Sequence, residues 1–522
     1  MRNTPAIGVR LRVISEHPGN TVKVNRLPYR IKPDPSRVIT RLFAWPEEHR
    51  NARRIERILA LPDDRAAQMA ADLREEYREH IADIVETWHE NYRAVQHLVP
   101  RQALPLPEHL QMLIGAFFTS EYAIESAALF NPSIVRAQDQ TGAPPGTTRF
   151  LMSFRATGEG HLSSVVFRSG AIDRENNITF EKQPRNRSPL QAVEDAAFNT
   201  RQFRRVLVDI GAHDPFQQMV LKELGEEFTL AELNAALDEA MNIHPLPVAW
   251  EESAATMLTL ARSDYRLEIP PGMDPAEIVI FPRSENERRG IEDLRLVQFT
   301  DEDGSQVLYG TYTAFNGTAV FPTLMELRDE RTIEVHTMRG QYALNKGMAL
   351  FPRRINGRYV MSGRLDGESL YILESDNVLV WNEGRIAQEP EYAWELSVMG
   401  NCGSPIETEE GWLLLTHGVG PMRQYCISAM LLDLEDPARM IGRLSEPLIV
   451  PTGDERIGYV PNVVYTCGAM LHNEWLLIPY AVSDSLTAFA TVDFRELLEA
   501  LKAGGRTLAG SSAHHMERGR EK

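Results

Sequence analysis

The stretch KGMALFPRRINGRYVMSGR, residues 346–364, decides the fold. It starts with a polar residue beside a glycine and continues as an apolar strand. It then turns at Asn356-Gly357 and returns as a second apolar strand. Asn-Gly between two apolar runs is a strong hairpin pattern, because both residues readily adopt the positive φ that a tight turn needs. The segment therefore predicts an antiparallel pair of strands with a polar residue at its start.

The same plan occurs five times along the chain. Polar starts near residues 290, 345, 400 and 458 are spaced 55, 55 and 58 residues apart, and an earlier one lies near Asn131. Multistrand units repeating at about 50 residues are typical of β-propellers. We predict a mainly β fold, a five-bladed β-propeller over residues 130–503. The alternative is a β-sandwich with unrelated hairpins, which the shared order of polar start, strand, turn and strand disfavours.

The N-terminal part of the chain reads as helical. Residues 34–100 carry start signals at Asp34-Pro35-Ser36 and at Leu61-Pro62-Asp63, followed by apolar residues at spacings of three and four. A shorter helical stretch runs from Glu108 to about Leu129. We therefore predict an N-terminal helical region over residues 1–129. Its apolar stripe needs a cover, so we expect it to pack on the propeller side and to support a homo-oligomer.

A second helical block, residues 188–265, interrupts the first repeat. Ser188-Pro189 reads as an N-cap with proline at the first helical position, and Thr229 with Glu232 makes a capping box. We predict a helical insertion in the first blade. The tail, residues 504–522, is rich in Gly, Ser and charged residues and is predicted to be disordered.

Composition narrows the possible functions. The 522 residues carry a formal net charge of −18, which disfavours a general nucleic-acid or acidic-membrane binder. Three cysteines do not suggest a disulfide framework, and we recognise neither a signal peptide nor a membrane span. We expect a cytoplasmic protein that has no nucleic-acid or membrane partner.

In a propeller, the equivalent polar residues of the blades converge on one mouth of the central channel. The strand starts supply Asn131, Asp293, Lys346, Ser404 and Asn462; the second strands supply Arg155, Tyr312, Arg364, His417 and Tyr480. By default each is an ordinary surface or strand-end residue. Together they suit a sugar and an anion, because carboxylates and amides bind hydroxyls and cations bind phosphate.

The same segments resemble glycoside hydrolase family 130, the β-mannoside phosphorylases and related β-mannosidases, whose fold is a five-bladed propeller. GIEDLRL at 290–296 is similar to the family's Gly-x-Glu-Asp-Pro-Arg motif, and NKGMALFPRRINGRYVM at 345–361 to its Lys-containing motif. GWLLLTHGVG, LLDLEDPARMIGR and GYVPNVVYTCG also resemble family motifs. Leu294 stands in place of the usual proline.

The resemblance implies roles for particular residues. Asp293 aligns with the general acid, which can act through a sugar hydroxyl. Arg155, Lys346, His417 and Tyr425 align with phosphate-binding residues, with Arg364 and Arg423 as further candidates. Asn131 and Asp484 look like contacts to the mannosyl unit. The resemblance implies no metal and no cofactor, with inorganic phosphate as co-substrate.

These residues favour an inverting β-mannoside phosphorylase that cleaves a manno-oligosaccharide to give mannose 1-phosphate. Phosphate is an anionic nucleophile, so one carboxylic acid and a cationic cradle suffice. Two alternatives stay open. One is a hydrolase of the same fold with Glu159, Glu292 or Glu368 as base. The other is a non-catalytic glycan-binding propeller. Trp381, Trp394 and Trp412 are core residues by default and sugar-subsite floors otherwise.

Overall fold

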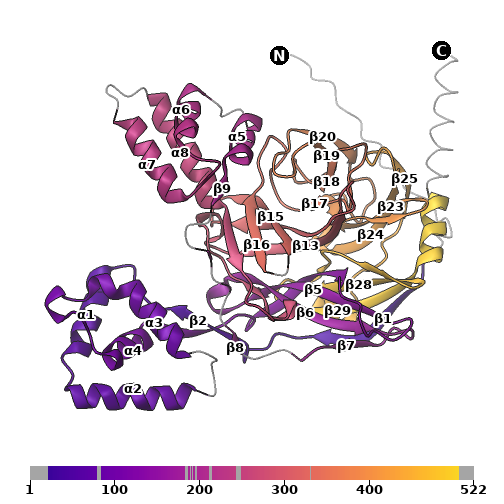
Figure 1. The fold of residues 1–522 in the computed structure, drawn as a ribbon. Helices are drawn as coiled ribbons and strands as arrows, with labels where there is room; N and C mark the ends of the chain where they lie inside the picture. Colours follow the sequence, from indigo (N-terminus) through magenta and orange to yellow (C-terminus); the bar gives the residue numbers. More distant parts are fainter. Residues whose placement is uncertain are drawn as a thin grey trace, which may run out of the picture.

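The computed structural model is built mainly of β-sheet (Figure 1). It describes residues 22–504, except 79–83, 183–185, 188–189, 191, 194–196, 211–213, 243–247 and 330. In this part of the chain the strands form five antiparallel sheets of four or five strands and two smaller sheets. We number the five larger sheets by the order of their central hairpins along the chain.

Each of the five sheets is built around consecutive antiparallel strands. The first sheet has β4 (Ala128–Arg136), β5 (Thr148–Thr157), β6 (Ser163–Ile172), β7 (Ile178–Phe180) and β12 (Val279–Ile280). The second has β11 (Tyr265–Glu268), β13 (Ile291–Thr300), β14 (Gln306–Phe315), β15 (Val320–Asp329) and β16 (Thr332–Thr337). The third has β17 (Ala349–Leu350), β18 (Tyr359–Gly363), β19 (Leu370–Ser375) and β20 (Glu383–Gln388). The fourth has β21 (Val398–Asn401), β22 (Ile406–Thr408), β23 (Gly411–Val419), β24 (Tyr425–Leu432) and β25 (Met440–Arg443). The fifth has β1 (Val24–Ile31), β26 (Val464–Tyr465), β27 (Met470–His472), β28 (Trp475–Val482) and β29 (Leu486–Asp493).

Adjacent sheets share apolar cores, and the sharing is cyclic. Phe150 and Met152 of the first sheet belong to one buried cluster with Leu477 and Phe489 of the fifth. Equivalent clusters join the first sheet to the second, the second to the third, the third to the fourth and the fourth to the fifth. Burial of these alternating apolar side chains supplies the main favourable free energy of folding. The five sheets therefore follow one another in a ring.

The hairpin turn predicted at Asn356-Gly357 is confirmed. Both residues have positive φ, 51° and 77°, and Ile355 pairs with Arg358 across the turn. The capping box at Thr229 is also confirmed. The Thr229 side chain accepts a hydrogen bond from the Glu232 backbone N–H, and the Glu232 carboxylate accepts one from the Thr229 backbone N–H. Local turn and cap chemistry was thus readable from the sequence alone.

The predicted N-terminal helical region, residues 1–129, is only partly helical. Residue 24 begins β1, which pairs with β29 of the fifth sheet, Val24 opposite Val492. Residues 38–42 form β2 rather than the start of a helix, and β2 pairs with β3 (Thr119–Ala123) and β8 (Asn186–Arg187). These strands form because distant segments complete their hydrogen bonds, which overrides a local helix pattern. Among the described residues of this region the α-helices are α1 (Glu48–Leu59), α2 (Asp63–Tyr77), α3 (Ile84–Val95) and α4 (Glu108–Phe117).

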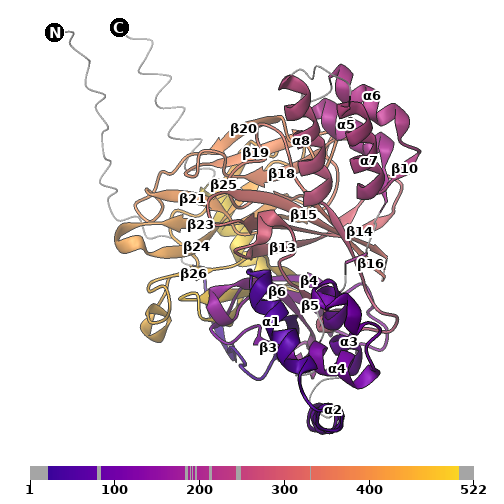
Figure 2. The same ribbon diagram turned by 90° about the vertical axis from the view of Figure 1, so that its left-hand side faces the viewer.

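Two groups of helices flank the sheets on different sides. Helices α1–α4 enclose their own core, which includes Ile55, Tyr92 and Leu113. Helices α5 (Thr200–Asp209), α6 (Pro215–Glu223), α7 (Leu230–Met241) and α8 (Val248–Ser263) lie in the chain between β6 and β12, and both ribbon views place them away from α1–α4 (Figure 2). Phe203 and Leu260 of this group pack into the core shared by the second and third sheets.

The remaining elements are short. β9 (Phe198–Asn199) pairs with β10 (Glu227–Phe228) beside the second helical group. The 3-10 helices are η1 (Gln96–Leu98), η2 (Arg101–Ala103), η3 (Glu159–His161), η4 (Pro275–Glu277), η5 (Glu285–Glu287), η6 (Pro421–Arg423) and η7 (Gly453–Arg456). The Ser188-Pro189 cap and residues 505–522 of the predicted disordered tail lie outside the described residues.

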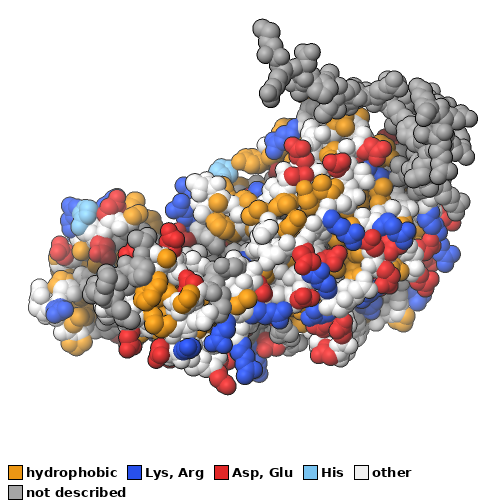
Figure 3. Space-filling model, turned by 90° about the horizontal axis from the view of Figure 1, so that it is seen from above, with side chains coloured by type: hydrophobic (Ala, Val, Ile, Leu, Met, Phe, Trp, Pro, Cys, Tyr) orange, Lys and Arg blue, Asp and Glu red, His pale blue; other side chains and the backbone are white. Residues whose placement is uncertain are grey.

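Surface charge and helix length are relevant to the expected absence of nucleic-acid and membrane partners. On the face shown in Figure 3, Lys and Arg side chains are interspersed with Asp and Glu side chains. Each helix in the described part of the chain is too short or too polar to span a lipid bilayer.

Candidate active site

The polar start of each sheet has an unusual backbone. Asn131, Asp293, Asn345 and Asn462 have φ of 46°, 59°, 65° and 63°, a left-handed conformation that is uncommon outside glycine. The fourth sheet has Gly403 with φ of 106° in the corresponding segment. Asn and Asp tolerate this conformation better than other side chains, which explains their recurrence. Strain of this kind gathers at functional sites, where the surrounding fold maintains it.

Asn131 and Asp293 are direct neighbours. Each lies at a register irregularity, between Phe130 and Ser133 in β4 and between Glu292 and Arg295 in β13. Such a bulge re-aims side chains that a regular ladder would place elsewhere. The Asn131 Nδ2 donates a hydrogen bond to Asp293 Oδ1 at 2.6 Å. The predicted general acid and a predicted sugar contact are therefore direct neighbours.

Cations surround the Asp293 carboxylate. Arg155 Nη1 lies 3.5 Å from its Oδ1, and Arg295 Nη1 donates to its main-chain oxygen at 3.1 Å. Burial by itself raises the pKa of Asp293. The charges of Arg155 and Arg295, helped by the Asn131 hydrogen bond and Lys346, outweigh burial and leave the pKa below its usual value. Asp293 is therefore ionised at neutral pH in the unliganded protein.

Glu292 joins two of the predicted phosphate-binding cations, Arg155 and Lys346. Its Oε1 accepts from Arg155 Nη2 at 2.9 Å, and its Oε2 lies 2.5 Å from Lys346 Nζ. The side chain of Glu292 is only 11% exposed, whereas that of Lys346 is 39% exposed. Burial lowers the pKa of Arg155, but the carboxylates of Asp293, Glu292 and Asp484 raise it above its usual value. Arg155 therefore stays charged.

His417 lies on β23 in a neutral form. Its Nδ1 is 3.0 Å from the Asn401 carbonyl oxygen, which can only accept, so Nδ1 carries the proton. Its Nε2 then accepts from Arg364 Nη1 at 3.2 Å. Burial and the nearby Arg364 lower the pKa of His417 to about 3. His417 is thus not itself a cation, and Arg364 supplies the positive charge at this position.

Aromatic rings flank His417. The Tyr425 ring is parallel to it, with ring centroids 6.0 Å apart and 2° between the planes. Tyr465 meets it edge-on, with centroids 5.1 Å apart. Tyr425 therefore joins the group through His417, and its role in phosphate binding stays a prediction.

Asp484 approaches from the turn between β28 and β29. It and Ser483 have φ of 50° and 48°. Burial and the Asp293 charge raise the pKa of Asp484 to about 6, although Arg155 and Arg423 lower it. The charges of Asp293, Arg155 and Arg423 thus all act on the Asp484 carboxyl group.

Contacts connect seven of the nine predicted site residues, and Asp484 and Arg423 are linked to them through their charges, although the individual roles of all nine stay predictions. Arg295 and Tyr465 were missed. Arg295 is buried, and its Nη2 donates to the Tyr465 hydroxyl at 2.7 Å, linking the Asp293 strand to the His417 ring. Both residues lie inside the quoted motifs, and Arg295 follows Asp293 by two positions. A buried arginine needs a partner, which was the available signal.

Two of the second-strand residues do not join the site. The hydroxyl groups of Tyr312 and Tyr480 donate to the buried carboxylates of Glu287 and Glu455, at 2.5 and 2.6 Å. Each carboxylate also closes the capping box of a short 3-10 helix, η5 or η7. These tyrosines therefore anchor the segments before the second and fifth strand starts. Their part in the convergent set was predicted wrongly.

The tryptophans, the alternative bases and Ser404 differ in how deeply they are buried. Trp381 and Trp412 are fully buried core residues, and Trp394 stacks on Tyr392 with ring centroids 6.0 Å apart. Of the three alternative hydrolytic bases, Glu159 and Glu368 are exposed, whereas Glu292 pairs with site cations. The Ser404 hydroxyl is buried, with no hydrogen-bond partner among the described atoms.

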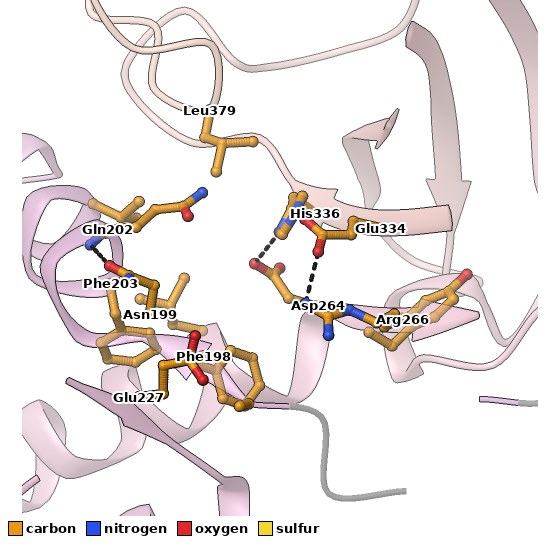
Figure 4. A pocket seen from close by; sticks show the side chains of 14 residues that line it. Phe198, Asn199, Gln202, Phe203, Glu227, Asp264, Arg266, Glu334, His336 and Leu379 are labelled. Carbon is orange, nitrogen blue, oxygen red and sulfur yellow. Dashed lines mark hydrogen bonds and ion pairs between the residues drawn. The ribbon is translucent and has the colours of Figure 1, made fainter. Parts of the chain in front are cut away.

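A separate pocket of about 190 Å³ lies where the second helical group meets the second sheet (Figure 4). It contains Asp264, Glu334 and His336, with His336 Nδ1 2.9 Å from Asp264 Oδ2. Burial lowers the pKa of His336, but hydrogen bonds to both carboxylates raise it to about 9. None of the nine predicted site residues lines this pocket.

The described residues include no group of three or more His, Cys, Asp and Glu side chains placed to hold a metal ion. The expectation that the reaction needs no metal and no cofactor stays a prediction.

Comparison with known proteins identifies relatives of this chain. Residues 273–503 match a family model described as β-1,4-mannooligosaccharide phosphorylase. The chain is 32% identical over 223 residues to a 1,2-β-oligomannan phosphorylase of Thermoanaerobacter sp., covering 42% of this chain and 73% of the relative. It is 33% identical over 212 residues to a β-1,2-mannobiose phosphorylase of the same organism, covering 39% and 67%. A solved structure of the Listeria innocua β-1,2-mannobiose phosphorylase with β-1,2-mannobiose has 20% identity, 72% and 92% coverage and a TM-score of 0.42.

The chain belongs to glycoside hydrolase family 130. The curated relatives are mannoside phosphorylases, which supports an enzyme that acts on carbohydrate.

Proposed function

We propose that this protein is an inverting β-mannoside phosphorylase that transfers a mannosyl unit from a manno-oligosaccharide to inorganic phosphate. The observation that carries the proposal is the pairing of Arg155 and Lys346 with Glu292, directly beside Asp293. Phosphorolysis requires cations that can hold phosphate beside a carboxylic acid, and Arg155 and Lys346 lie beside Asp293 in this way. Arginine gives a fork of charged hydrogen bonds to phosphate and lysine gives a point charge.

In the proposed reaction, phosphate takes the place of the Glu292 oxygens on Arg155 and Lys346. A phosphate oxygen attacks the anomeric carbon from the face opposite the glycosidic oxygen. The bond to that oxygen breaks, and Asp293 supplies its proton, directly or through a sugar hydroxyl. The products are mannose 1-phosphate with inverted configuration and an oligosaccharide one unit shorter.

The ionised state of Asp293 fits an ordered binding step. A general acid must be protonated, yet Arg155 and Lys346 both lower the pKa of this carboxylate in the unliganded protein. Bound phosphate neutralises these cations. We therefore expect the pKa of Asp293 to rise when phosphate binds, so that the proton becomes available only in the complex.

The proposal extends to the architecture of the whole chain. The cyclic packing of five antiparallel sheets supports a five-bladed β-propeller, with α5–α8 as an insertion in its first blade. The exposed apolar side chains Leu42, Phe43, Trp45 and Phe117 beside α1–α4 support self-association through this region. Light scattering at several concentrations tests it, and a monomer at every concentration would contradict it. A cytoplasmic location stays a prediction.

The deciding experiment is cleavage of β-1,2-, β-1,3- and β-1,4-mannobiose with and without phosphate, scored for mannose 1-phosphate and free mannose. Phosphate-dependent mannose 1-phosphate, abolished by Asp293→Asn, is expected. The names of the relatives make β-1,2 and β-1,4 linkages the first to test. Free mannose at an unchanged rate without phosphate would identify a hydrolase instead. Sugar binding without any product would identify a glycan-binding protein.

A further inference from the structure

Two exposed aromatic rings stand beside the candidate site. Tyr459 is 69% exposed, and its ring stacks on His161 with centroids 5.8 Å apart and 22° between the planes. His161 is also exposed. Tyrosine normally buries much of its ring against the protein, so an exposed stacked pair next to a site is a candidate binding surface.

The backbone fixes Tyr459 next to Asp484. The Tyr459 N–H donates to Ser485 Oγ at 2.9 Å, and the Val460 N–H donates to the Ser483 carbonyl oxygen at 3.0 Å. These two bonds bracket Asp484, the predicted mannosyl contact. The tyrosine ring is therefore held at the edge of the sugar site, with its exposure set by the fold.

His161 is fixed by its own turn. It has φ of 58°, an uncommon conformation for a non-glycine residue, and follows Gly160 with φ of 67°. The Tyr122 hydroxyl donates to the carbonyl oxygens of Glu159 and Leu162, at 2.8 and 3.3 Å. This turn follows directly after β5, the strand that carries Arg155. Two separately anchored segments thus hold the pair together, and such strain is typical of ligand contacts.

Differences in solvent exposure distinguish a buried sugar position at Asp293 and Arg155 from an outer one at Tyr459. The side chains of Asp293 and Arg155 are 17% and 21% exposed, so the bond to be cleaved must enter the site to reach them. Tyr459, at 69%, lies farther out. A sugar resting on Tyr459 is therefore on the leaving side of the cleaved bond.

The chemistry of the occupant follows from the rings. A β-linked mannopyranose directs the hydrogens of C1, C3 and C5 to one face, while its axial 2-hydroxyl projects from the other. The first face is apolar and matches the flat face of an aromatic ring. Aromatic contacts of this size are each worth a two- to tenfold change in affinity.

We propose that Tyr459, supported by His161, is an aromatic subsite for leaving-side mannosyl units and sets the preference for chains longer than the disaccharide. This inference rests on the proposed phosphorylase function. It assigns these residues to substrate binding and not to bond cleavage.

The test is phosphorolysis of β-mannobiose and β-mannotriose of the accepted linkage by the parent, Tyr459→Ala and Tyr459→Phe. We expect Tyr459→Ala to raise the KM for the trisaccharide three- to tenfold, with a smaller change for the disaccharide. Its kcat and its KM for phosphate should stay within twofold of the parent. Tyr459→Phe should retain the parent KM. Ile457→Ala is the matched control, because Ile457 is 75% exposed two positions away.

An unchanged trisaccharide KM in Tyr459→Ala, while the parent is active, would overturn the subsite and leave the phosphorylase intact. If the parent turns over no β-mannoside, calorimetric titration with β-mannotriose tests the aromatic subsite separately from the phosphorylase function. Weaker binding by Tyr459→Ala than by the parent would keep the subsite and reject the phosphorylase. Equal binding, or no binding by either, would reject the subsite. Thermal unfolding of both variants checks that the fold is retained.

Discussion

Lys346 Nζ lies 2.5 Å from Glu292 Oε2, and Arg155 binds the other oxygen of the same carboxylate. The buried carboxylate of Glu292 is thus paired with both Lys346 and Arg155, the cations that we assign to phosphate binding. Without it, Lys346 would lose its ion pair and Arg155 would keep only the charges of Asp293 and Asp484, which is costly in a partly buried site. The carboxylate stabilises the empty site and competes with the incoming anion.

Replacing Glu292 by Gln should therefore tighten phosphate binding. The amide keeps the shape but loses the negative charge, so Arg155 and Lys346 attract phosphate more strongly. We expect the KM for phosphate to fall about three- to tenfold, measured at saturating mannoside. Glu368→Gln, an exposed carboxylate on a neighbouring turn, serves as the control. A rise in the phosphate KM of Glu292→Gln would mean that the carboxylate positions the cations rather than opposing phosphate.

Lys346→Met should act in the opposite direction. The variant keeps the length of the side chain but removes one charge from the cradle. The KM for phosphate should rise at least about tenfold, with the KM for the mannoside changed less than about twofold. Lys502→Met is a matched control, because Lys502 makes the same 2.5 Å ion pair, with Glu410, on the surface. Equal effects on both substrates would place Lys346 outside the phosphate site.

Asp484 should give mannoside binding a pH dependence. Its pKa is raised to about 6, so it is ionised above this pH and neutral below it. An ionised carboxylate accepts more strongly from sugar hydroxyls, so the KM for the mannoside should fall as the pH rises from 5 to 7. Asp484→Asn should remove this step in a profile of KM against pH. A step that survives in the variant would assign the titration to another group.

The same shift makes a prediction about stability. The folded pKa of Asp484 lies above the usual value of 3.8, so the folded state binds more protons than the unfolded state between these values. The free energy of unfolding therefore decreases as the pH rises from about 4 to 6, because the extra proton bound by folded Asp484 is released. Asp484→Asn should raise Tm at pH 8 and change it less at pH 4. Thermal unfolding at both pH values checks this, and an equal change at both would argue against it.

His336 should stabilise the junction with α5–α8 at low and neutral pH. Its folded pKa of about 9 exceeds the usual 6.5, so its stabilising contribution is complete below 6.5 and lost as the pH rises through 9. His336→Gln should lower Tm at pH 6 and have little effect at pH 10. The exposed His97 offers His97→Gln as the control. A loss that does not depend on pH would reflect packing in the pocket of Figure 4 instead.

The sequence revealed the site better than it revealed the partners of buried polar groups. Asn131, Asp293 and Lys346 were found because their segments repeat, and a repeat places equivalent residues at one end of neighbouring sheets. Tyr312 and Tyr480 share that repeat, yet they turn to Glu287 and Glu455, which sequence spacing does not pair with them. The neutral state of His417 also depends on burial and on Arg364, both of which arise from tertiary packing.

The strand β1 shows the same limit for the fold. Val22, Val24, Tyr29 and Ile31 make a weak alternation, but a register irregularity between Arg26 and Arg30 interrupts it. Its partner is β29, far along the chain. A pattern search within short windows does not join two such segments, so the N-terminal region was read as wholly helical.

The pairing of Val24 with Val492 has a consequence for biosynthesis. The ribosome releases β1 long before β29 exists, so the early strand has to wait with an unpaired edge while most of the polypeptide is translated. Contacts of such large sequence separation slow folding, and exposed edges invite aggregation. Removing residues 22–31 would avoid this delay but would leave β29 paired on one side only, with β28. The strand β1 is thus synthesised early, but its pairing with β29 forms only after nearly the whole chain has been made.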